Sequence, residues 1–271
     1  MSERADMADT AVDAAKLFSL AGRKAIVMGV GTLGRTAAAI LASAGASVLL
    51  VDGDAAALQR QTQALRLRST APVEYLATRP NDEQGAAAMV DTALQRLGGL
   101  DILVVTAGVN IVAEATEMPA EEWDEVMNVN VRVAWLAARA AARAMIASGQ
   151  GGKIVLTSSV RGEFGLHGYS AYVPAKHAVN GLVRSLACEW GRHRINVNAL
   201  APSIFRSDLT AWMFSDQEPG ASVRNRMLSR IPIGRLAEPA DFAGAILFLC
   251  APASDFCTGH VLYVDGGYAA C

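Results

Sequence analysis

The sequence lacks the features that would place the protein in a membrane, on nucleic acid or in an oxidising compartment. Its 271 residues include only four cysteines, none in a CxxC pair, and the formal net charge is -2. Such a charge gives no electrostatic footprint for nucleic acid or an anionic membrane. No apolar run is long enough to span a bilayer. Scattered cysteines without a disulfide framework fit a reducing compartment. We therefore expect a soluble, cytoplasmic protein with no nucleic-acid or membrane partner.

The first residues also lack the basic start and apolar middle of a signal peptide. We expect residues 1–15 to form a mobile extension and residues 16–271 to form one domain, because no linker, repeat or low-complexity tract divides them. The histidines, cysteines and acidic residues show no metal-ligand spacing, so no metal is expected.

What the chain does contain is a regular alternation of short apolar runs and alanine-rich stretches. The runs are mostly continuously apolar, which is typical of parallel strands covered on both faces. This pattern predicts a single α/β domain of Rossmann type, a doubly wound, seven-stranded parallel sheet in the order 3-2-1-4-5-6-7 with helices on both faces. The predicted strands are residues 25–28, 47–51, 73–77, 102–106, 154–158, 195–200 and 261–264, and the predicted helices are residues 35–44, 54–68, 82–97, 120–147, 175–191 and 239–249.

One long segment, residues 203–232, interrupts the alternation after the sixth predicted strand. It carries Trp212, Met213 and Phe214. A long excursion near the carboxyl ends of parallel strands is a place for a substrate lid. A surface helix that packs on its own domain or on a neighbouring subunit is an equally good interpretation.

A GxGxxG sequence, residues 29–34, follows the first predicted strand and opens the first helix. In that context glycines permit a tight turn and let a pyrophosphate approach the N–H groups of a helix N-terminus. Asp52 ends the second strand, where a carboxylate can accept both ribose hydroxyls of an adenosine and repel a 2′-phosphate. The next residue is Gly53 and not an arginine, so we expect NAD as the cofactor. The alternatives are glycines that only pack helix on strand and an Asp52 that only caps a helix.

Tyr172 and Lys176 lie four residues apart at the start of a predicted helix, hence on one face. A free phenol titrates near pH 10 and is a poor base at neutral pH. A lysine cation and a positive nicotinamide nearby would lower that pKa. The pair therefore predicts a phenol that acts as general acid and base.

These segments, taken together and in order, resemble the short-chain dehydrogenase/reductase family over nearly the whole chain. The matching segments are residues 29–34, 106–108 (TAG), 123–130 (WDEVMNVN), 157–159 (TSS), 172–176 (YVPAK) and 195–202 (INVNALAP). The resemblance implies a homotetramer and an NAD-dependent oxidoreductase that moves a hydride between nicotinamide and a secondary alcohol or ketone.

The resemblance also implies roles for individual residues. Ser159 would hold the substrate oxygen, Tyr172 would transfer the hydroxyl proton, and Lys176 would bind the nicotinamide ribose. Asn130 would support a water in the proton relay. Ser158 and Asn128 compete with Ser159 and Asn130, but their positions fit the motifs less well. The residues implied in cofactor binding are Gly29, Gly31, Thr32, Leu33, Gly34, Asp52, Ala107, Gly108, Tyr172, Lys176, Ile204 and Ser207.

The chain departs from the family pattern in the glycine-rich turn, which is one residue short and follows Met28 where a threonine is usual. Thr106 replaces an asparagine of the fourth strand, Thr78 replaces an aspartate near the adenine, and Ser203 replaces a glycine. These departures leave the turn in place but loosen the assignment of single phosphate contacts.

The substrate is a small molecule whose class the residues leave open. Arg161 could pair with the carboxylate of a sugar acid or hydroxy acid, a class that we consider together with polyols. Trp212 and its apolar neighbours could instead cover a cyclic apolar alcohol. His167 and Tyr169 lie near Tyr172 in the sequence and could touch either substrate. A non-catalytic NAD-binding protein is the remaining alternative.

Overall fold

A computed structural model describes residues 12–207, 210–215, 217, 218 and 220–271 of the protein. Its centre is a seven-stranded parallel sheet in the order β3-β2-β1-β4-β5-β6-β7, which confirms the predicted fold class and strand order. Continuously buried strands such as β4, which is buried at each of its four residues, explain why the apolar runs do not alternate. The strands are β1 (Lys24–Met28), β2 (Ser47–Asp52), β3 (Val73–Ala77), β4 (Ile102–Val105), β5 (Gly152–Thr157), β6 (Ile195–Pro202) and β7 (Val261–Val264).

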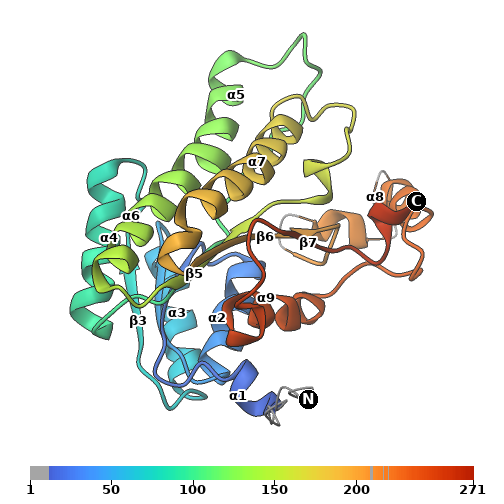
Figure 1. Ribbon diagram of the computed structural model, residues 1–271. Helices are drawn as coiled ribbons and strands as arrows, with labels where there is room; N and C mark the ends of the chain where they lie inside the picture. Colours follow the sequence, from blue (N-terminus) through green and yellow to red (C-terminus); the bar gives the residue numbers. More distant parts are fainter. Residues whose placement is uncertain (1–11, 208–209, 216, 219) are drawn as a thin grey trace, which may run out of the picture.

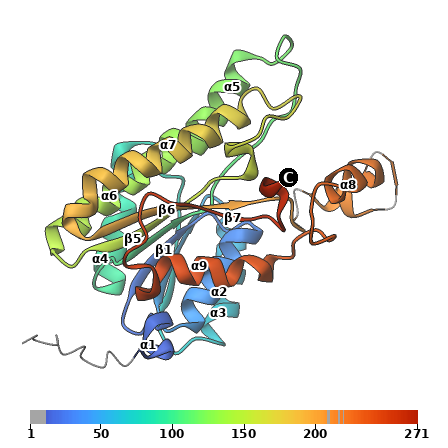
Figure 2. The same cartoon turned by 45° about the vertical axis from the view of Figure 1, so that its right-hand side comes forward.

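Helices cover both faces of this sheet (Figures 1 and 2). One apolar core lies between the sheet and α4 (Glu83–Leu97), α6 (Val133–Ser148) and α7 (Tyr172–Trp190). A second core lies between the opposite face and α2 (Thr32–Ser43), α3 (Ala55–Arg66) and α9 (Ala243–Cys250). The carboxyl ends of all seven strands therefore meet at one edge, where loops carry the candidate site.

The single helix predicted over residues 120–147 is wrong in detail. The segment forms α5 (Ala120–Met127), a π-helical turn η1 (Asn128–Arg132) and then α6. No proline or glycine marks this change in the sequence, because a π-turn arises from backbone hydrogen bonds that the residue pattern does not record. Three-residue and four-residue 3-10 turns also occur, and one of them, η5 (Pro239–Phe242), precedes α9.

The insertion contains a 3-10 turn, η4 (Ala211–Phe214), and the helix α8 (Gly220–Leu228). Both views place α8 beside the C-terminus, at the end of the sheet that also carries β7 (Figures 1 and 2). A small apolar cluster joins the insertion to the loop after β5 and to the C-terminal segment, and it includes Val160, Ile231 and Tyr268. The lid remains a prediction.

The predicted mobile extension, residues 1–15, falls mostly outside the described residues. A short helix, α1 (Ala14–Phe18), begins inside it, and Asp13 caps this helix by accepting hydrogen bonds from Ala15 N and Lys16 N. In the described part of the chain, no helix is both long and apolar enough to cross a bilayer.

Candidate active site

The glycine-rich turn between β1 and α2 is built for a close approach. Gly29 has a φ of +97°, and a Cβ there would lie 2.7 Å from Ala107 N and 2.8 Å from Thr106 Oγ1. Gly34 packs against the Gly29 carbonyl. Gly31 caps α2 without a side-chain hydrogen bond, and a Cβ on Gly31 would meet nothing within 4 Å. The turn thus leaves open space at a helix N-terminus, which fits the pyrophosphate of a dinucleotide.

The remaining predicted residues of this region lie around the turn. Thr32 begins α2 and accepts a hydrogen bond from Arg35, and Leu33 is buried beneath it. Ala107 donates its N–H to Met28 O at 3.1 Å, so β4 is joined directly to the turn. The hydroxyl of Thr106 donates to the Met28 and Gly29 carbonyls, which shows how the chain braces a turn of unusual length.

Asp52 links the end of β2 to the glycine-rich turn. Its Oδ2 accepts a hydrogen bond from Val30 N at 2.9 Å, and its Oδ1 accepts one from Asp54 N at 3.0 Å. Asp54, and not Asp52, caps α3, because its carboxylate accepts the Ala57 N–H. The alternative that Asp52 serves as the helix cap is therefore wrong. The carboxylate is half-buried and lies next to the glycine-rich turn.

Arg79 is a residue that sequence reasoning missed. Asp52 pairs with Ala77 in the β2–β3 register, so the residues after each strand are neighbours. The Arg79 side chain lies over Gly53, where an added Cβ would overlap its Nε and come within 2.8 Å of its Cγ. The residue after Asp52 in the chain is Gly53, as the NAD expectation assumed, but the fold brings the Arg79 side chain to this position. The predicted adjacency of the second and third strands was the signal that could have found it.

Tyr172 and Lys176 lie in the first turns of α7, against the carboxyl end of β5. Lys176 is 2% exposed and donates from Nζ to the Thr157 carbonyl at 2.9 Å. Its Nζ lies 5.3 Å from the centre of the Tyr172 ring. Ser159 follows β5 and forms a hydrogen bond with the Tyr172 hydroxyl. The structure thus brings together three residues that the sequence placed in two separate segments.

Burial controls the titration of both groups. Burial raises the pKa of Tyr172 to about 12, while the hydrogen bond from Ser159 and the positive charge of Arg161 act in the opposite direction. Burial also lowers the pKa of Lys176 to about 8. The expected lowering of the phenol pKa is therefore absent from the protein by itself. The physical reason is that desolvation of the phenolate outweighs the nearby positive charge.

The two serines after β5 point to different partners. Ser158 Oγ donates to Asn180 Oδ1 on α7 at 2.6 Å. Asn180 in turn donates to the Gly162 carbonyl, so Ser158 helps to hold the loop. Ser159 Oγ instead accepts the Arg161 N–H at 3.1 Å and bonds to Tyr172. Of the two competing residues, Ser159 is the one placed at the phenol.

Asn130 lies inside the π-helical turn and is 2% exposed. Its Nδ2 donates to Val109 O at 2.8 Å and to Val126 O at 2.9 Å, while its Oδ1 is buried without a hydrogen-bond partner in the described structure. A Cβ on Gly108 would lie 2.8 Å from this oxygen and 3.7 Å from Lys176 Nζ. A buried acceptor without a donor fits a bound water or cofactor group. The competing Asn128 is turned toward Arg132 instead.

The remaining predicted residues differ in how close the structure places them to Tyr172. Tyr169 packs edge-on against Tyr172, with ring centres 6.2 Å apart. His167 has 82% of its side chain exposed, and its Nε2 lies 3.2 Å from a Glu114 carboxylate oxygen. The Trp212 side chain lies outside the described residues. Ile204 borders the small apolar cluster, and the Ser207 hydroxyl shares a hydrogen bond of 2.9 Å with Thr210.

Arg161 is buried next to the site, with 6% of the residue exposed. Its guanidinium donates to the Gly165 carbonyl and, at 3.1 Å, to Tyr268 Oη. Arg230 donates to the same oxygen at 2.7 Å. Neither Arg230 nor Tyr268 was predicted from the sequence, since Arg230 lies in the insertion and Tyr268 in the C-terminal segment.

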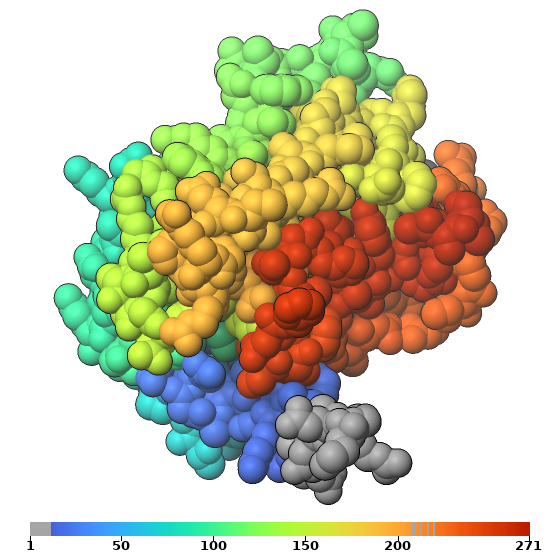
Figure 3. Space-filling model, viewed as in Figure 1, coloured from blue at the N-terminus to red at the C-terminus, as the bar shows by residue number. Residues whose placement is uncertain are grey.

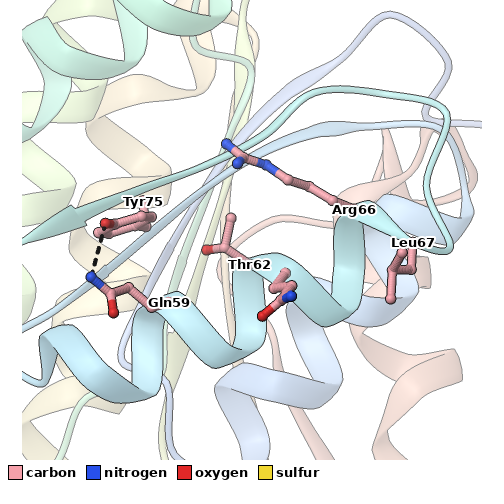
Figure 4. Close-up of a pocket in the computed structure, with 6 residues that line it drawn as sticks. Gln59, Thr62, Arg66, Leu67 and Tyr75 are labelled. Atoms are coloured by element: carbon pink, nitrogen blue, oxygen red, sulfur yellow. Dashed lines mark hydrogen bonds between the residues drawn. The ribbon is translucent and has the colours of Figure 1, made fainter.

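Two pockets lie elsewhere and contain none of the predicted site residues. One, of about 350 Å³, lies between α3 and β3 and is lined by Gln59, Thr62, Gln63, Arg66, Leu67 and Tyr75 (Figure 4). The other, of about 540 Å³, lies at the amino ends of the central strands around Lys153 and Asn196. The part of the chain that the structure describes has no group of three or more potential metal ligands.

Comparison with known proteins shows relatives over nearly the whole chain. A family model described as enoyl-(acyl carrier protein) reductase matches residues 29–269. An uncharacterized oxidoreductase of Mycobacterium tuberculosis is 48% identical over 256 residues, which cover 94% of each chain. The 2-dehydro-3-deoxy-D-gluconate 5-dehydrogenase of Escherichia coli is 34% identical, over 93% of this chain and 98% of its own.

Among solved structures, a gluconate 5-dehydrogenase from Burkholderia cenocepacia, in complex with NADP and tartrate, has a similar fold. It superimposes with a TM-score of 0.89 at 31% identity and covers 96% of this chain and 100% of its own.

Proposed function

Because this chain belongs to the short-chain dehydrogenase/reductase family, we propose that it is a nicotinamide-dependent oxidoreductase that interconverts a secondary alcohol of the sugar-acid or polyol type and its ketone. The observation that carries the proposal is the cluster of Ser159, Tyr172 and Lys176, with the unpartnered Asn130 Oδ1 beside it. The names of the relatives support the substrate type.

The residues present fit a dinucleotide. The open turn at Gly31 would hold the pyrophosphate, Asp52 the adenosine ribose, and Lys176 the nicotinamide ribose. Ala107 and Gly108 would border the cofactor, and Ile204 and Ser207 would lie at the carboxamide. When bound in its oxidised form, the nicotinamide supplies the hydride acceptor and a positive charge beside the phenol.

Asp52 favours NAD because a carboxylate at the ribose repels a 2′-phosphate. Arg79 over Gly53 adds a positive charge at the same place and lets NADP compete. The NADP complex of the Burkholderia cenocepacia relative supports this weaker discrimination. We therefore propose NAD as the preferred cofactor, with NADP also accepted.

In the mechanism, Ser159 holds the substrate oxygen and Tyr172 removes its proton during oxidation. A phenol with a pKa of about 12 holds its proton too tightly to act as a base at neutral pH, so catalysis needs additional positive charge near it. The oxidised nicotinamide would supply that charge when it is bound, and Lys176, with a pKa of about 8, can pass a proton onward. A water held by Asn130 Oδ1 would carry the proton away from Lys176.

A dehydrogenase needs this tuned cluster, whereas a protein that only binds a dinucleotide does not, so we favour the enzyme over the binding protein. The test is turnover by wild type, Tyr172→Phe and the distant control Tyr75→Phe, with NAD and NADP and a panel of sugar acids, polyols and cyclic alcohols. We expect Tyr172→Phe to lose about 10²- to 10⁴-fold in kcat with little change in cofactor binding. Full turnover in Tyr172→Phe would refute the mechanism. Tight cofactor binding without turnover of any substrate would favour the binding protein.

A further inference from the structure

Two arginines converge on one tyrosine, and one of them, Arg161, is hydrogen-bonded through its backbone N–H to Ser159. Arg161 and Arg230 both donate to Tyr268 Oη, at 3.1 and 2.7 Å. Their guanidinium carbons lie 5.3 and 4.3 Å from the centre of the Tyr268 ring. Arg161 comes from the turn after β5, Arg230 from the insertion, and Tyr268 from the C-terminal segment. Segments of these three regions adjoin at one end of the molecule, coloured yellow, orange and red (Figure 3).

This cluster has two positive charges but no carboxylate. Neither guanidinium forms an ion pair with a carboxylate of the described residues. Asp265, which is close in sequence to Tyr268, uses its oxygens to accept the N–H groups of Gly267 and Ala269. A phenol oxygen offers only partial negative charge, so the repulsion between two nearby guanidiniums is not neutralised. Of the two arginines, Arg161 is buried and Arg230 is exposed. A buried cation such as Arg161 is costly without a counter-charge, and a bound anion would lower that cost.

The cluster also adjoins the reacting groups. The backbone N–H of Arg161 donates to Ser159 Oγ at 3.1 Å, and the Arg161 charge is felt at the Tyr172 hydroxyl, where it acts to lower the phenol pKa. Apolar side chains, among them Phe164 and Met227, surround the cluster. Low polarity around the buried Arg161 guanidinium strengthens its attraction for an anion.

We propose that Arg161 and Arg230 form a carboxylate subsite, which holds the acid end of the substrate while one of its secondary hydroxyls lies at Ser159 and Tyr172. The planar fork of a guanidinium matches the two oxygens of a carboxylate. The inference rests on the proposed function and narrows it, because it selects a polyhydroxy acid over a neutral polyol and over a cyclic apolar alcohol. Tyr268 is a positioning residue, because its hydroxyl oxygen accepts hydrogen bonds from both guanidinium groups and orients them.

The test compares substrates that differ only at the acid end, such as D-gluconate with sorbitol and D-galactonate with galactitol. We expect wild type to prefer the acid of a pair. Arg230→Gln should lower the ratio of kcat/KM for acid over polyol by about 10- to 100-fold, the size of a lost charge-assisted hydrogen bond. The control is Arg226→Gln, because Arg226 is exposed on the neighbouring α8 and does not donate to Tyr268 Oη. An unchanged ratio in Arg230→Gln, or a wild type without preference, would overturn the subsite.

Binding gives a second readout that does not need turnover. Tartrate, a small hydroxy dicarboxylate, should raise the melting temperature of the cofactor-loaded wild type and do so much less in Arg230→Gln and in Arg161→Gln. Circular dichroism of each variant checks that it folds. If no substrate turns over, the proposed function fails, yet a tartrate effect that depends on Arg230 would still support the anion subsite. Equal tartrate binding by wild type and both variants would refute it.

Discussion

A buried lysine lies at each end of β5, Lys153 within the strand and Lys176 on the adjacent α7. The two lysines differ in whether a carboxylate pairs with them. At the amino end, Lys153 lies 2.7 Å from the Asp255 carboxylate and donates to Asn196 Oδ1 at 2.9 Å. At the carboxyl end, Lys176 donates to a carbonyl, and no carboxylate pairs with it in the described structure. One charge is neutralised within the protein and the other is left for a ligand.

The same difference extends to other cations at the two edges of the sheet. At the amino edge, Arg23 pairs with Asp101 at 3.1 Å. At the carboxyl edge, Arg79, Arg161 and Arg230 show no carboxylate partner within the described ranges. Charges that serve the fold are paired by the fold, whereas charges that serve binding wait for an anion. The contrast holds for these residues and not for every cation, because Arg194 at the amino edge donates to the Gly149 carbonyl and Arg206 at the carboxyl edge pairs with Glu238.

The strongest test of this contrast removes each lysine charge in turn. Lys176→Met should reduce kcat by about 10²- to 10³-fold, because the phenol loses its neighbouring cation. Lys153→Met should keep its activity but lose about 1–3 kcal/mol in the free energy of unfolding, since it leaves Asn196 and Ser254 without a buried donor. Steady-state kinetics gives kcat and urea unfolding gives the free energy of unfolding for both variants. Equal losses of kcat in the two variants would contradict the contrast between the two lysines.

The next prediction concerns an uncharged group at the same edge of the sheet, the unpartnered Oδ1 of Asn130. Asn130→Ala should lower kcat by about 10²-fold if this oxygen holds a water of the proton relay. The solvent deuterium isotope effect on kcat should rise, because proton transfer then limits the rate. Asn128→Ala is the matched control, and an equal kinetic loss there would mean that both effects come from disturbing the π-helical turn.

A smaller effect is expected from the charge at Arg79. Arg79→Ala should lower kcat/KM for NADP by about 10-fold relative to NAD, and Asp52→Ala should shift the ratio toward NADP by about as much. Gly53→Ala should imitate Arg79→Ala, because the new Cβ would displace the flexible arginine side chain. Unchanged ratios in all three variants would show that neither charge faces the ribose.

The smallest effect is the shifted titration of Lys176, which has a pKa of about 8. With only four lysines in the chain, carbon NMR of the lysine Cε atoms can follow each one, and Lys176→Met assigns the signal. A lowered pKa means that the unfolded chain binds this proton more tightly, so the Lys176 contribution to stability rises from pH 8 toward its ordinary 10.5. A Lys176 signal that titrates at the ordinary value would contradict this burial effect.

Much of the fold and part of the candidate site could be predicted from the sequence. Apolar runs of strand length located the seven strands, and the Rossmann-type alternation with helices predicted their order. Local spacing placed Tyr172 and Lys176 on one helix face. Asn130, Ser159 and the glycine-rich turn came from their motifs, and the structure gathers them around the same strand ends. What the sequence missed, such as Arg79 and Arg230, belongs to no motif and reaches its place by strand adjacency or by the packing of an insertion.

The sequence by itself determined which groups can do chemistry, because a phenol four residues before a lysine shares its face wherever that segment is helical. Only the tertiary structure decided the pKa values of those groups and the pairing of their charges. Burial raises the pKa of Tyr172 and lowers that of Lys176, and both shifts depend on the layers packed around α7. The pairing of charges is likewise tertiary, since Asp255 reaches Lys153 from a distant part of the chain while nothing comparable reaches Lys176 within the described residues. Desolvation and charge pairing are sums over neighbours in space, and only the fold supplies those neighbours.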